Sequence, residues 1–217
     1  MMNSSNLFII TAPSGTGKTS LIKEAVNSID HLGFSVSYTT RAPRPSEKDG
    51  ESYYFINEDA FEEKIKSGEF AEYAKVYDHY YGTAWQDLVG LRSQEKDVIL
   101  EIDYQGAINI QKIIPEAISI FILPPSFEAL QSRLVNRNED SDETMKIRLQ
   151  RACGEMKKAT EFDYIIFNNE FNQAFDGLKS IILSQRLKWR SLGLKELKVL
   201  ESLTNHDIIN DSEKKEG

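Results

Sequence analysis

The chain has 217 residues, of which 40% are hydrophobic and 28% are charged. This length suffices for one α/β domain with a proper core, and the composition is ordinary for a globular protein. The formal net charge of -8 argues against a generally basic nucleic-acid binder, although a few arginines could still gather around an anionic substrate. The single cysteine, Cys153, excludes an internal disulfide and a cysteine zinc cluster.

The sequence carries no sign of export or membrane insertion. Its first residues, MMNSSN, lack the basic region and the apolar core of a signal peptide. No apolar run approaches the roughly 20 residues that a membrane helix needs. A lone cysteine also suits a reducing compartment. We therefore expect a cytoplasmic protein without a membrane partner, and the sequence is compatible with both a monomer and a homo-oligomer.

The first expected elements are a strand and a helix joined by a glycine-rich loop. LFII (7–10) is short and apolar, as a buried strand is, and apolar residues recur at helical spacing over 21–29. The loop between them reads APSGTGKT (12–19). A phosphate-binding loop requires this placement, after a strand and at the opening of a helix.

The loop nearly matches the pattern G-x-x-x-x-G-K-[ST], with Ala12 in the first glycine position. Gly15 and Gly17 can adopt positive φ and bring backbone N–H groups close to an anion, and the helix N-terminus adds partial positive charge. Lys18 would reach the β- and γ-phosphates of a nucleotide, and the Thr19 hydroxyl would hold Mg²⁺. The alternative is an ordinary tight junction, but Gly-Lys-Thr at the helix start favours ATP binding. The predicted ATP-binding residues are Ala12, Pro13, Ser14, Gly15, Thr16, Gly17, Lys18 and Thr19.

The segment after the first helix predicts a second strand and then a small inserted unit. FSVSY (34–38) alternates as a strand does, and the proline-rich TRAPRP (40–45) cannot be helical. Residues 41–96 then combine a charged helix over 59–67, a strand over 70–76 and many aromatic side chains. We expect an inserted α+β region here.

Near-continuous apolar runs over 97–103, 118–123 and 164–167 predict strands that are covered on both faces. The chain therefore reads as a single domain over 6–197 with a parallel sheet flanked by helices. Its expected parts are a core (6–40, 97–125 and 159–197), the insertion (41–96), a polar lid (126–158) and a polar C-terminal tail (198–217). This organisation resembles a nucleotide kinase, in which insertion and lid face each other across the loop at the carboxyl ends of the strands.

Six motifs in order make the resemblance specific. They are TTRxxRP (39–45), GxxYxF (50–55), YYGT (80–83), IDxQG (102–106), SIFILPP (119–125) and RLxxR (133–137). Together they resemble the guanylate kinase family over about residues 6–192, and that family's loop commonly begins Ala-Pro-Ser-Gly. The resemblance implies a P-loop NTPase core with a GMP-binding insertion and a helical lid. It also implies transfer of the γ-phosphoryl group of ATP to GMP, and to dGMP, in purine nucleotide metabolism and GMP recycling.

The resemblance also assigns the acceptor site. Guanidinium forks and phenol hydroxyls suit a phosphate, and the matching residues are Arg41, Arg44, Tyr53 and Tyr81. The guanine base would be read by Ser37, Glu72, Thr83 and Asp103. A carboxylate at Glu72 can accept from the guanine N1–H and 2-amino groups, which adenine lacks. Asp103 could contact either guanine or the waters of a metal ion.

The remaining implied roles concern charge neutralisation and the adenine base. Phosphoryl transfer between two anions needs positioning and positive charge, which gives the predicted catalytic residues Lys18, Arg41, Arg133, Arg137 and Arg148. Asn168 matches the position that holds the adenine edge. One departure is Asn138, where the family usually has glycine.

Each assignment has a plainer alternative. Tyr53 and Tyr81 could simply fill the core of the insertion, and Arg41 and Arg44 could be solvated. The lid arginines could pair with nearby acidic residues (Glu139, Asp140 and Asp142), and Asn168 could be a turn residue. Glu72 differs, because it lies in an alternating strand with apolar neighbours, where a carboxylate is unusual.

Three other functions compete with a guanylate kinase. A non-catalytic module of the same fold would bind phosphorylated peptides, but such modules usually lose the loop or its lysine. A kinase for a sugar phosphate would not need the guanine-reading pair Glu72 and Ser37. A P-loop ATPase or switch would not need the tyrosine-rich insertion with Arg41 and Arg44.

Overall fold

Two β-sheets form the framework of the protein, which the computed structural model describes over residues 5–76, 78–135 and 142–204. The larger sheet has five strands in the order β2-β7-β1-β8-β9, all paired in parallel. Its strands are β1 (Leu7–Thr11), β2 (Leu32–Ser35), β7 (Asp97–Glu101), β8 (Ile118–Leu123) and β9 (Tyr164–Phe167). This sheet confirms the predicted α/β class.

Helices cover both faces of the five-stranded sheet, which explains why its strands are apolar almost throughout. In the central strand β1, Phe8 and Ile10 face one cluster with α1 (Lys18–Ser28) and α7 (Phe171–Arg186). Leu7 and Ile9 face the opposite cluster, which includes residues of α3 (Trp85–Ser93) and α4 (Tyr104–Ile113). The core therefore lies on both sides of β1 and fixes the strand end from which the glycine-rich loop departs.

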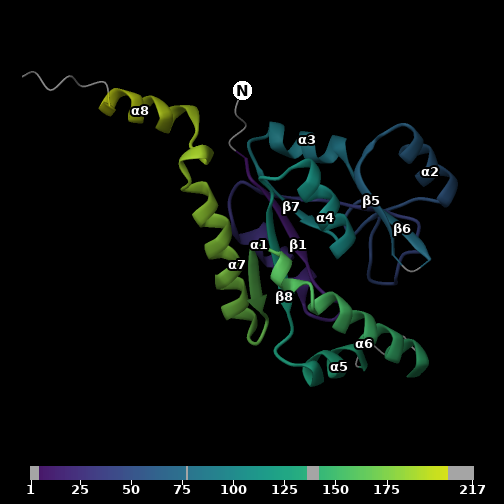
Figure 1. Ribbon diagram of the computed structural model, residues 1–217. Coiled ribbons are helices and arrows are strands. Elements are labelled where there is room, and N and C mark those ends of the chain that lie inside the picture. Colours follow the sequence, from purple (N-terminus) through teal and green to yellow (C-terminus); the bar gives the residue numbers. More distant parts are fainter. Residues whose placement is uncertain (1–4, 77, 136–141, 205–217) are drawn as a thin grey trace, which may run out of the picture.

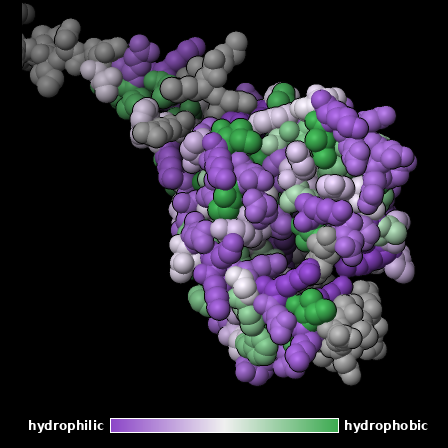
Figure 2. Space-filling model, turned by 45° about the vertical axis from the view of Figure 1, so that its right-hand side comes forward, coloured by the Kyte–Doolittle hydropathy of each residue, from purple (hydrophilic) through white to green (hydrophobic). Residues whose placement is uncertain are grey.

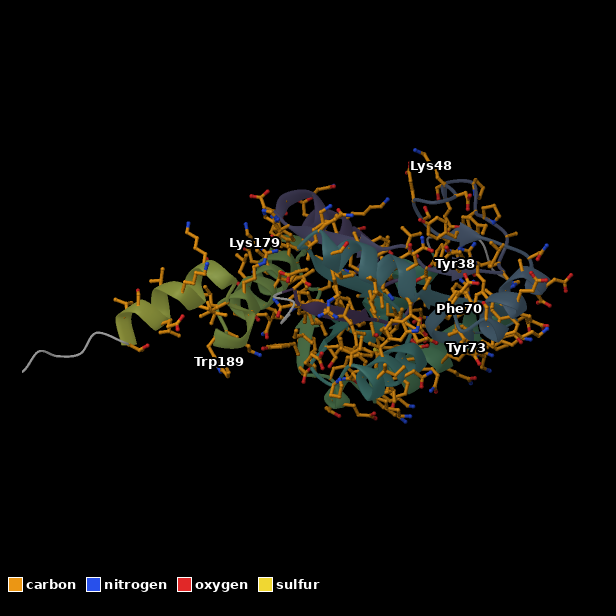
Figure 3. The ribbon with its side chains drawn as sticks, turned by 90° about the horizontal axis from the view of Figure 1, so that it is seen from above. Tyr38, Lys48, Phe70, Tyr73, Lys179 and Trp189 are labelled. Carbon is orange, nitrogen blue, oxygen red and sulfur yellow. The ribbon has the colours of Figure 1, made fainter. Side chains whose placement is uncertain are left out.

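The smaller sheet has four strands in the order β4-β3-β6-β5 and lies beside the larger one (Figure 1). Its strands are β3 (Tyr38–Thr39), β4 (Tyr54–Phe55), β5 (Phe70–Val76) and β6 (His79–Ala84), and α2 (Glu58–Lys66) packs against them. Phe61 of α2 is fully buried and stacks on Phe70 and Tyr80, with ring centroids 4.5 Å and 5.2 Å away. Figure 3 labels Tyr38, Phe70 and Tyr73 in this unit.

The lid segment contains two helices, α5 (Phe127–Val135) and α6 (Asp142–Met156), followed by the short helix η1 (Ala159–Glu161). Leu130 and Leu134 of α5 pack on Ala152 of α6. After α7 the chain continues through η2 (Trp189–Ser191) into α8 (Leu194–Thr204), which extends away from the body (Figure 1). Within the described residues, no helix is both long enough and apolar enough to span a membrane.

The strand predicted over 34–38 is divided, because β2 ends at Ser35 in the larger sheet and β3 begins at Tyr38 in the smaller one. Leu88 of α3 packs into the core with Leu7 and Ile9, and helix α8 extends to Thr204. The boundaries of the insertion (41–96), the lid (126–158) and the tail (198–217) stay predictions.

Candidate active site

The glycine-rich loop leaves β1 at Thr11 and enters α1 at Lys18. Gly15 and Gly17 have φ values of 88° and 90°, the left-handed region that favours glycine. A Cβ at Gly17 would also lie only 2.6 Å from Nδ2 of Asn168. No side chain caps the start of α1, so its first N–H groups remain available to an anion. The loop therefore has the shape and polarity of a phosphate cradle.

Lys18 and Thr19 both contact Glu101, a residue that was not predicted from the sequence. Nζ of Lys18 lies 3.8 Å from Oε1 of Glu101, and the Thr19 hydroxyl donates a 2.7 Å hydrogen bond to the same oxygen. Glu101 ends β7 and pairs with Ile10 of β1, so it stands at the carboxyl edge of the sheet beside the loop. A charged residue that ends an apolar strand next to a phosphate loop was the signal that could have identified it.

A cavity of about 220 Å³ opens between the loop, the smaller sheet and the lid. The predicted residues that line it are Ser14, Lys18, Ser37, Tyr53, Glu72, Tyr81 and Asp103, and they are joined by Ala74, Val76, Glu101, Ile102 and Glu155. The fold thus brings together residues from the loop and from the proposed acceptor region that are far apart in the sequence. The molecular face shown in Figure 2 is mostly hydrophilic, with scattered hydrophobic residues.

Glu72 is the most unusual carboxylate of the cavity, with only 6% of its surface exposed. Thr83, on the neighbouring strand, donates a 2.8 Å hydrogen bond to its Oε1. Burial raises the pKa of Glu72 to about 7, helped by the nearby charge of Asp103 and opposed by the Thr83 hydrogen bonds. Ser37 is buried close by in the cavity wall. Three of the predicted guanine-reading residues are therefore buried: Glu72 and Thr83 are hydrogen-bonded to each other, and Ser37 lines the same cavity as Glu72.

Asp103 caps α4, because its Oδ1 accepts a 2.8 Å hydrogen bond from the backbone N–H of Gly106. Gly106 also supports Glu72: a Cβ there would lie 2.6 Å from Oε2 of Glu72. The absence of a side chain at Gly106 thus makes room for the Glu72 carboxylate. The carboxylates of Asp103 and Glu72 both lie next to Gly106, 3.2 Å and 2.6 Å from where its Cβ would be.

Arg41 binds Glu47, a second acidic residue that was not predicted from the sequence. Nη2 of Arg41 lies 2.8 Å and 2.9 Å from the two Glu47 carboxylate oxygens, and Arg44 Nη1 lies 3.9 Å from one of them. The Arg41 guanidinium carbon lies 5.6 Å from the ring centroid of Tyr53, which in turn lies 5.9 Å from that of Tyr81. Burial raises the pKa of Tyr53, so its hydroxyl stays protonated as a donor. The four predicted phosphate-binding residues are therefore neighbours.

The lid supplies Arg133 from α5 and Arg148 from α6, while Arg137 and Asn138 lie outside the described residues. Nη1 of Arg133 donates to the carbonyl oxygen of Thr16, and Nη2 donates to that of Asn168, both at 3.3 Å. Arg133 thus touches the phosphate loop itself. Glu155 of α6 reaches the cavity, where burial raises its pKa while the charge of Lys18 lowers it.

Asn168 follows β9 and has only 5% of its surface exposed. Its Nδ2 donates a 2.7 Å hydrogen bond to the carbonyl oxygen of Thr16, and its backbone N–H donates to that of Leu123. The side chain therefore binds the backbone of the phosphate loop at Thr16. Its contact with adenine stays a prediction.

Mg²⁺ prefers oxygen ligands and usually keeps several waters and phosphate oxygens in its octahedral shell. The Thr19 hydroxyl and the Glu101 carboxylate provide two such oxygens side by side at the mouth of the loop. No group of three or more His, Cys, Asp or Glu residues arranged for a metal occurs within the described part of the chain. The donors present thus suit a magnesium ion that arrives with a nucleotide rather than one held by the protein alone.

Comparisons with known proteins agree with this geometry. The family model described as "Guanylate kinase" matches residues 4–185. A guanylate kinase of Methylobacillus flagellatus is 50% identical over 183 residues, covering 84% of this chain and 91% of that protein. One from Legionella pneumophila is 43% identical over 201 residues, covering 93% and 96%.

The solved structures include a guanylate kinase from Anaplasma phagocytophilum. It has a TM-score of 0.75 and 29% sequence identity, and the match covers 94% of this chain and 97% of that one. The match in fold, the cavity shared by loop and acceptor region, and the similarity over most of the sequence lead to one conclusion: the chain belongs to the guanylate kinase family.

Proposed function

We propose that the protein transfers the γ-phosphoryl group of ATP to GMP, giving ADP and GDP, and that the reaction takes place in the cavity beside the phosphate loop. One observation carries this proposal above all others. Ser14 and Lys18 of the loop line the same cavity as Glu72 and Tyr81 of the acceptor region. A donor phosphate and an acceptor nucleotide can therefore meet there. The activity is a step of nucleotide metabolism.

The loop would hold ATP through backbone N–H groups of residues 12–19 and through Lys18. Lys18 lines the cavity, and its ion pair with Glu101 is long, at 3.8 Å. Asn168 would help to hold the ATP-binding loop in place, because its amide nitrogen donates a 2.7 Å hydrogen bond to the Thr16 carbonyl oxygen. Thr19 and Glu101 would hold Mg²⁺, which neutralises phosphate charge when it is bound.

The acceptor phosphate would bind to the two arginines and two tyrosines, and the base to the buried group around Glu72. Ionised Glu72 accepts hydrogen bonds from N1–H and the 2-amino group of guanine. Adenine offers neither donor, so AMP would leave a buried carboxylate unpaired, which is costly. Asp103 caps α4 with one oxygen, and its other oxygen is available to guanine or to a metal-bound water.

Little proton chemistry is needed for the transfer itself. An anionic oxygen of the GMP phosphate forms the new bond to the γ-phosphorus, the bond from that phosphorus to the β,γ-bridging oxygen breaks, and ADP leaves with those electrons. Lys18, Arg41, Arg133 and Arg148 would neutralise the charge that gathers between the two nucleotides, and Arg137 would join them. Closure of the lid would align the reactants and exclude water as a competing acceptor.

Several features oppose the other functions. A sugar phosphate has no base to pair with the buried Glu72 and Thr83. A simple ATPase does not need the cluster of arginines and tyrosines next to the cavity. A non-catalytic module does not need Lys18, which the loop retains. We extend the proposal to dGMP as a second acceptor and to a cytoplasmic location, where ATP and GMP occur, without a nucleic-acid partner.

The test is ADP release from Mg·ATP with GMP, AMP, CMP or UMP as acceptor. We expect turnover with GMP, its loss in Lys18→Ala, and a sharp decrease in Glu72→Ala. The matched control is Lys23→Ala, an exposed lysine of the same helix, which should leave turnover unchanged. Tight GMP binding without turnover would support the non-catalytic module instead. Equal turnover with all four nucleotides would exclude guanine recognition by Glu72.

A further inference from the structure

Glu47 makes more contacts within the acceptor-phosphate region than a surface acid normally does. Its two carboxylate oxygens lie 2.8 Å and 2.9 Å from Nη2 of Arg41. One of them also accepts a 2.8 Å hydrogen bond from the backbone N–H of Arg44. In return, the backbone N–H of Glu47 donates to the carbonyl oxygen of Arg44 at 3.0 Å. Glu47 thus closes the turn over 44–47 and binds the Arg41 side chain at the same time.

The Arg41 guanidinium has further contacts besides Glu47. Its Nη1 donates to the carbonyl oxygen of Ala42 at 2.7 Å, and its side chain also hydrogen-bonds Tyr81, another predicted phosphate-binding residue. The guanidinium carbon lies 5.6 Å and 5.9 Å from the ring centroids of Tyr53 and Phe55. A guanidinium has five N–H donors, so it can bind Glu47 and a phosphate oxygen at the same time.

The Glu47–Arg41 pair is also sheltered from water. The Arg41 side chain is 16% exposed and the Glu47 side chain 15%. Burial raises the pKa of Glu47, but the hydrogen bonds from Arg44 and Arg41 and the charges of both arginines together lower it below its ordinary value, so the carboxylate stays ionised. Ion pairs of this kind hold one geometry, whereas exposed pairs between long side chains contribute little.

We propose that Glu47 is a positioning residue of the acceptor-phosphate site, which fixes the Arg41 fork and the 44–47 turn before GMP binds. The inference rests on the proposed function, in which Arg41 binds the GMP phosphate. Preorganisation of this kind strengthens binding, because the arginine loses little side-chain freedom when the phosphate arrives. The opposite role is a competitor, in which Glu47 occupies Arg41 and must be displaced by the phosphate.

The variant Glu47→Gln separates the two roles, because it keeps the size of the side chain and removes its charge. The matched control is Glu51→Gln. Glu51 lies in the same loop but is 69% exposed and pairs only loosely with Lys48, at 3.4 Å. Figure 3 shows Lys48 pointing away from the body of the protein. Glu47→Asp, which keeps the charge but shortens the side chain, serves as the conservative variant.

The readouts are the KM values for GMP and ATP, kcat, and the binding of GMP and of guanosine followed by NMR titration. We expect Glu47→Gln to weaken GMP binding by about tenfold, the usual effect of losing a charge-assisted hydrogen bond. Guanosine binding and the KM for ATP should change by less than about twofold, because neither involves the acceptor phosphate. Glu47→Asp should lie between Glu47→Gln and the wild type, and Glu51→Gln should match the wild type.

Three results would overturn the inference. Tighter GMP binding in Glu47→Gln would identify Glu47 as a competitor. Unchanged GMP binding would show that Arg41 needs no support. An equal loss for GMP and guanosine would show that Glu47 only stabilises the fold. The wild-type protein tests the proposed function separately. If the wild type neither binds nor phosphorylates GMP, the proposed function is wrong. If the wild type is active and only the Glu47 variants depart from the expected results, the role of Glu47 alone is wrong.

Discussion

The Thr83 hydroxyl donates a 2.8 Å hydrogen bond to Oε1 of Glu72 between the paired strands β5 and β6. Thr83 is fully buried and Glu72 is 6% exposed, so water compensates little of the carboxylate charge. The second oxygen, Oε2, faces the space above Gly106. Burial raises the pKa of Glu72 to about 7, because the two neutral donors of Thr83 offset only part of the cost of a buried charge and Asp103 adds repulsion. Two N–H donors from guanine would supply the further hydrogen bonds that stabilise the ionised carboxylate.

We predict that guanine binding weakens as the pH falls below about 7, the pKa of Glu72 in the free protein. Only the ionised carboxylate can accept from both guanine donors, so each pH unit below the pKa should cost about tenfold in affinity. GMP also takes up a proton on its phosphate near pH 6. Guanosine lacks that phosphate, so its binding between pH 8 and pH 5.5 is the measurement. Affinity for guanosine that is independent of pH would contradict the assignment of Glu72.

Stability of the free protein should show the same titration. The folded pKa of Glu72 is about 7, against 4.5 for the exposed group, so folding favours the protonated form. Its contribution is fully present below pH 4.5 and is lost as the pH rises through 7, a decrease of about 3 kcal/mol in unfolding free energy. Denaturant unfolding of wild type and Glu72→Gln at a series of pH values measures it. The unfolding free energy of Glu72→Gln should increase relative to that of the wild type as the pH rises. A difference between the two proteins that does not change with pH would contradict the raised pKa of Glu72.

Gly106→Ala should damage guanine recognition without unfolding the protein. The new methyl group would lie 2.6 Å from Oε2 of Glu72, so the carboxylate must move. Because a displacement of about 1 Å at a reaction site can cost a hundredfold, we expect kcat/KM for GMP to fall by roughly that factor. Gly177→Ala in α7 is the control, since nothing lies within 4 Å of its new methyl group. That variant should be more stable by about 0.5–1 kcal/mol and fully active.

The sequence predicted those features that depend on local patterns. Apolar runs over 97–103 and 118–123 gave β7 and β8, because strands covered on both faces carry apolar side chains throughout. The loop over 12–19 was recognisable because its glycines and lysine are adjacent in the chain. The division of the predicted strand over 34–38 could not be recognised in the sequence. The alternation of side chains does not show that the chain passes from one sheet to another.

The acidic residues of the site were harder to predict, for a physical reason. Glu47 becomes notable only through its hydrogen bonds to Arg41 and Arg44, and Glu155 through its burial. Glutamate is common on protein surfaces, so these two look ordinary in the sequence. Glu101 differs, because its place at the end of an apolar strand beside the loop was a usable signal. Glu72 also differs, because its immediate neighbours are apolar. Tertiary contacts, rather than residue type, therefore distinguish the acids of the site from solvated ones.

Nδ2 of Asn168 donates a 2.7 Å hydrogen bond to the carbonyl oxygen of Thr16 in the phosphate loop. Asn168→Asp replaces that donor with an oxygen that repels the carbonyl, while the shape of the side chain is kept. Since the bond is buried, we expect the KM for ATP to rise by about tenfold. The KM for GMP should stay nearly unchanged. Loss of the loop geometry should affect ATP and GTP as donors equally, because their phosphates are the same. The decisive measurement is therefore the ratio of kcat/KM for ATP and GTP in wild type and variant: an unchanged ratio supports a role through the loop, and a changed ratio would show that Asn168 reads the adenine edge instead.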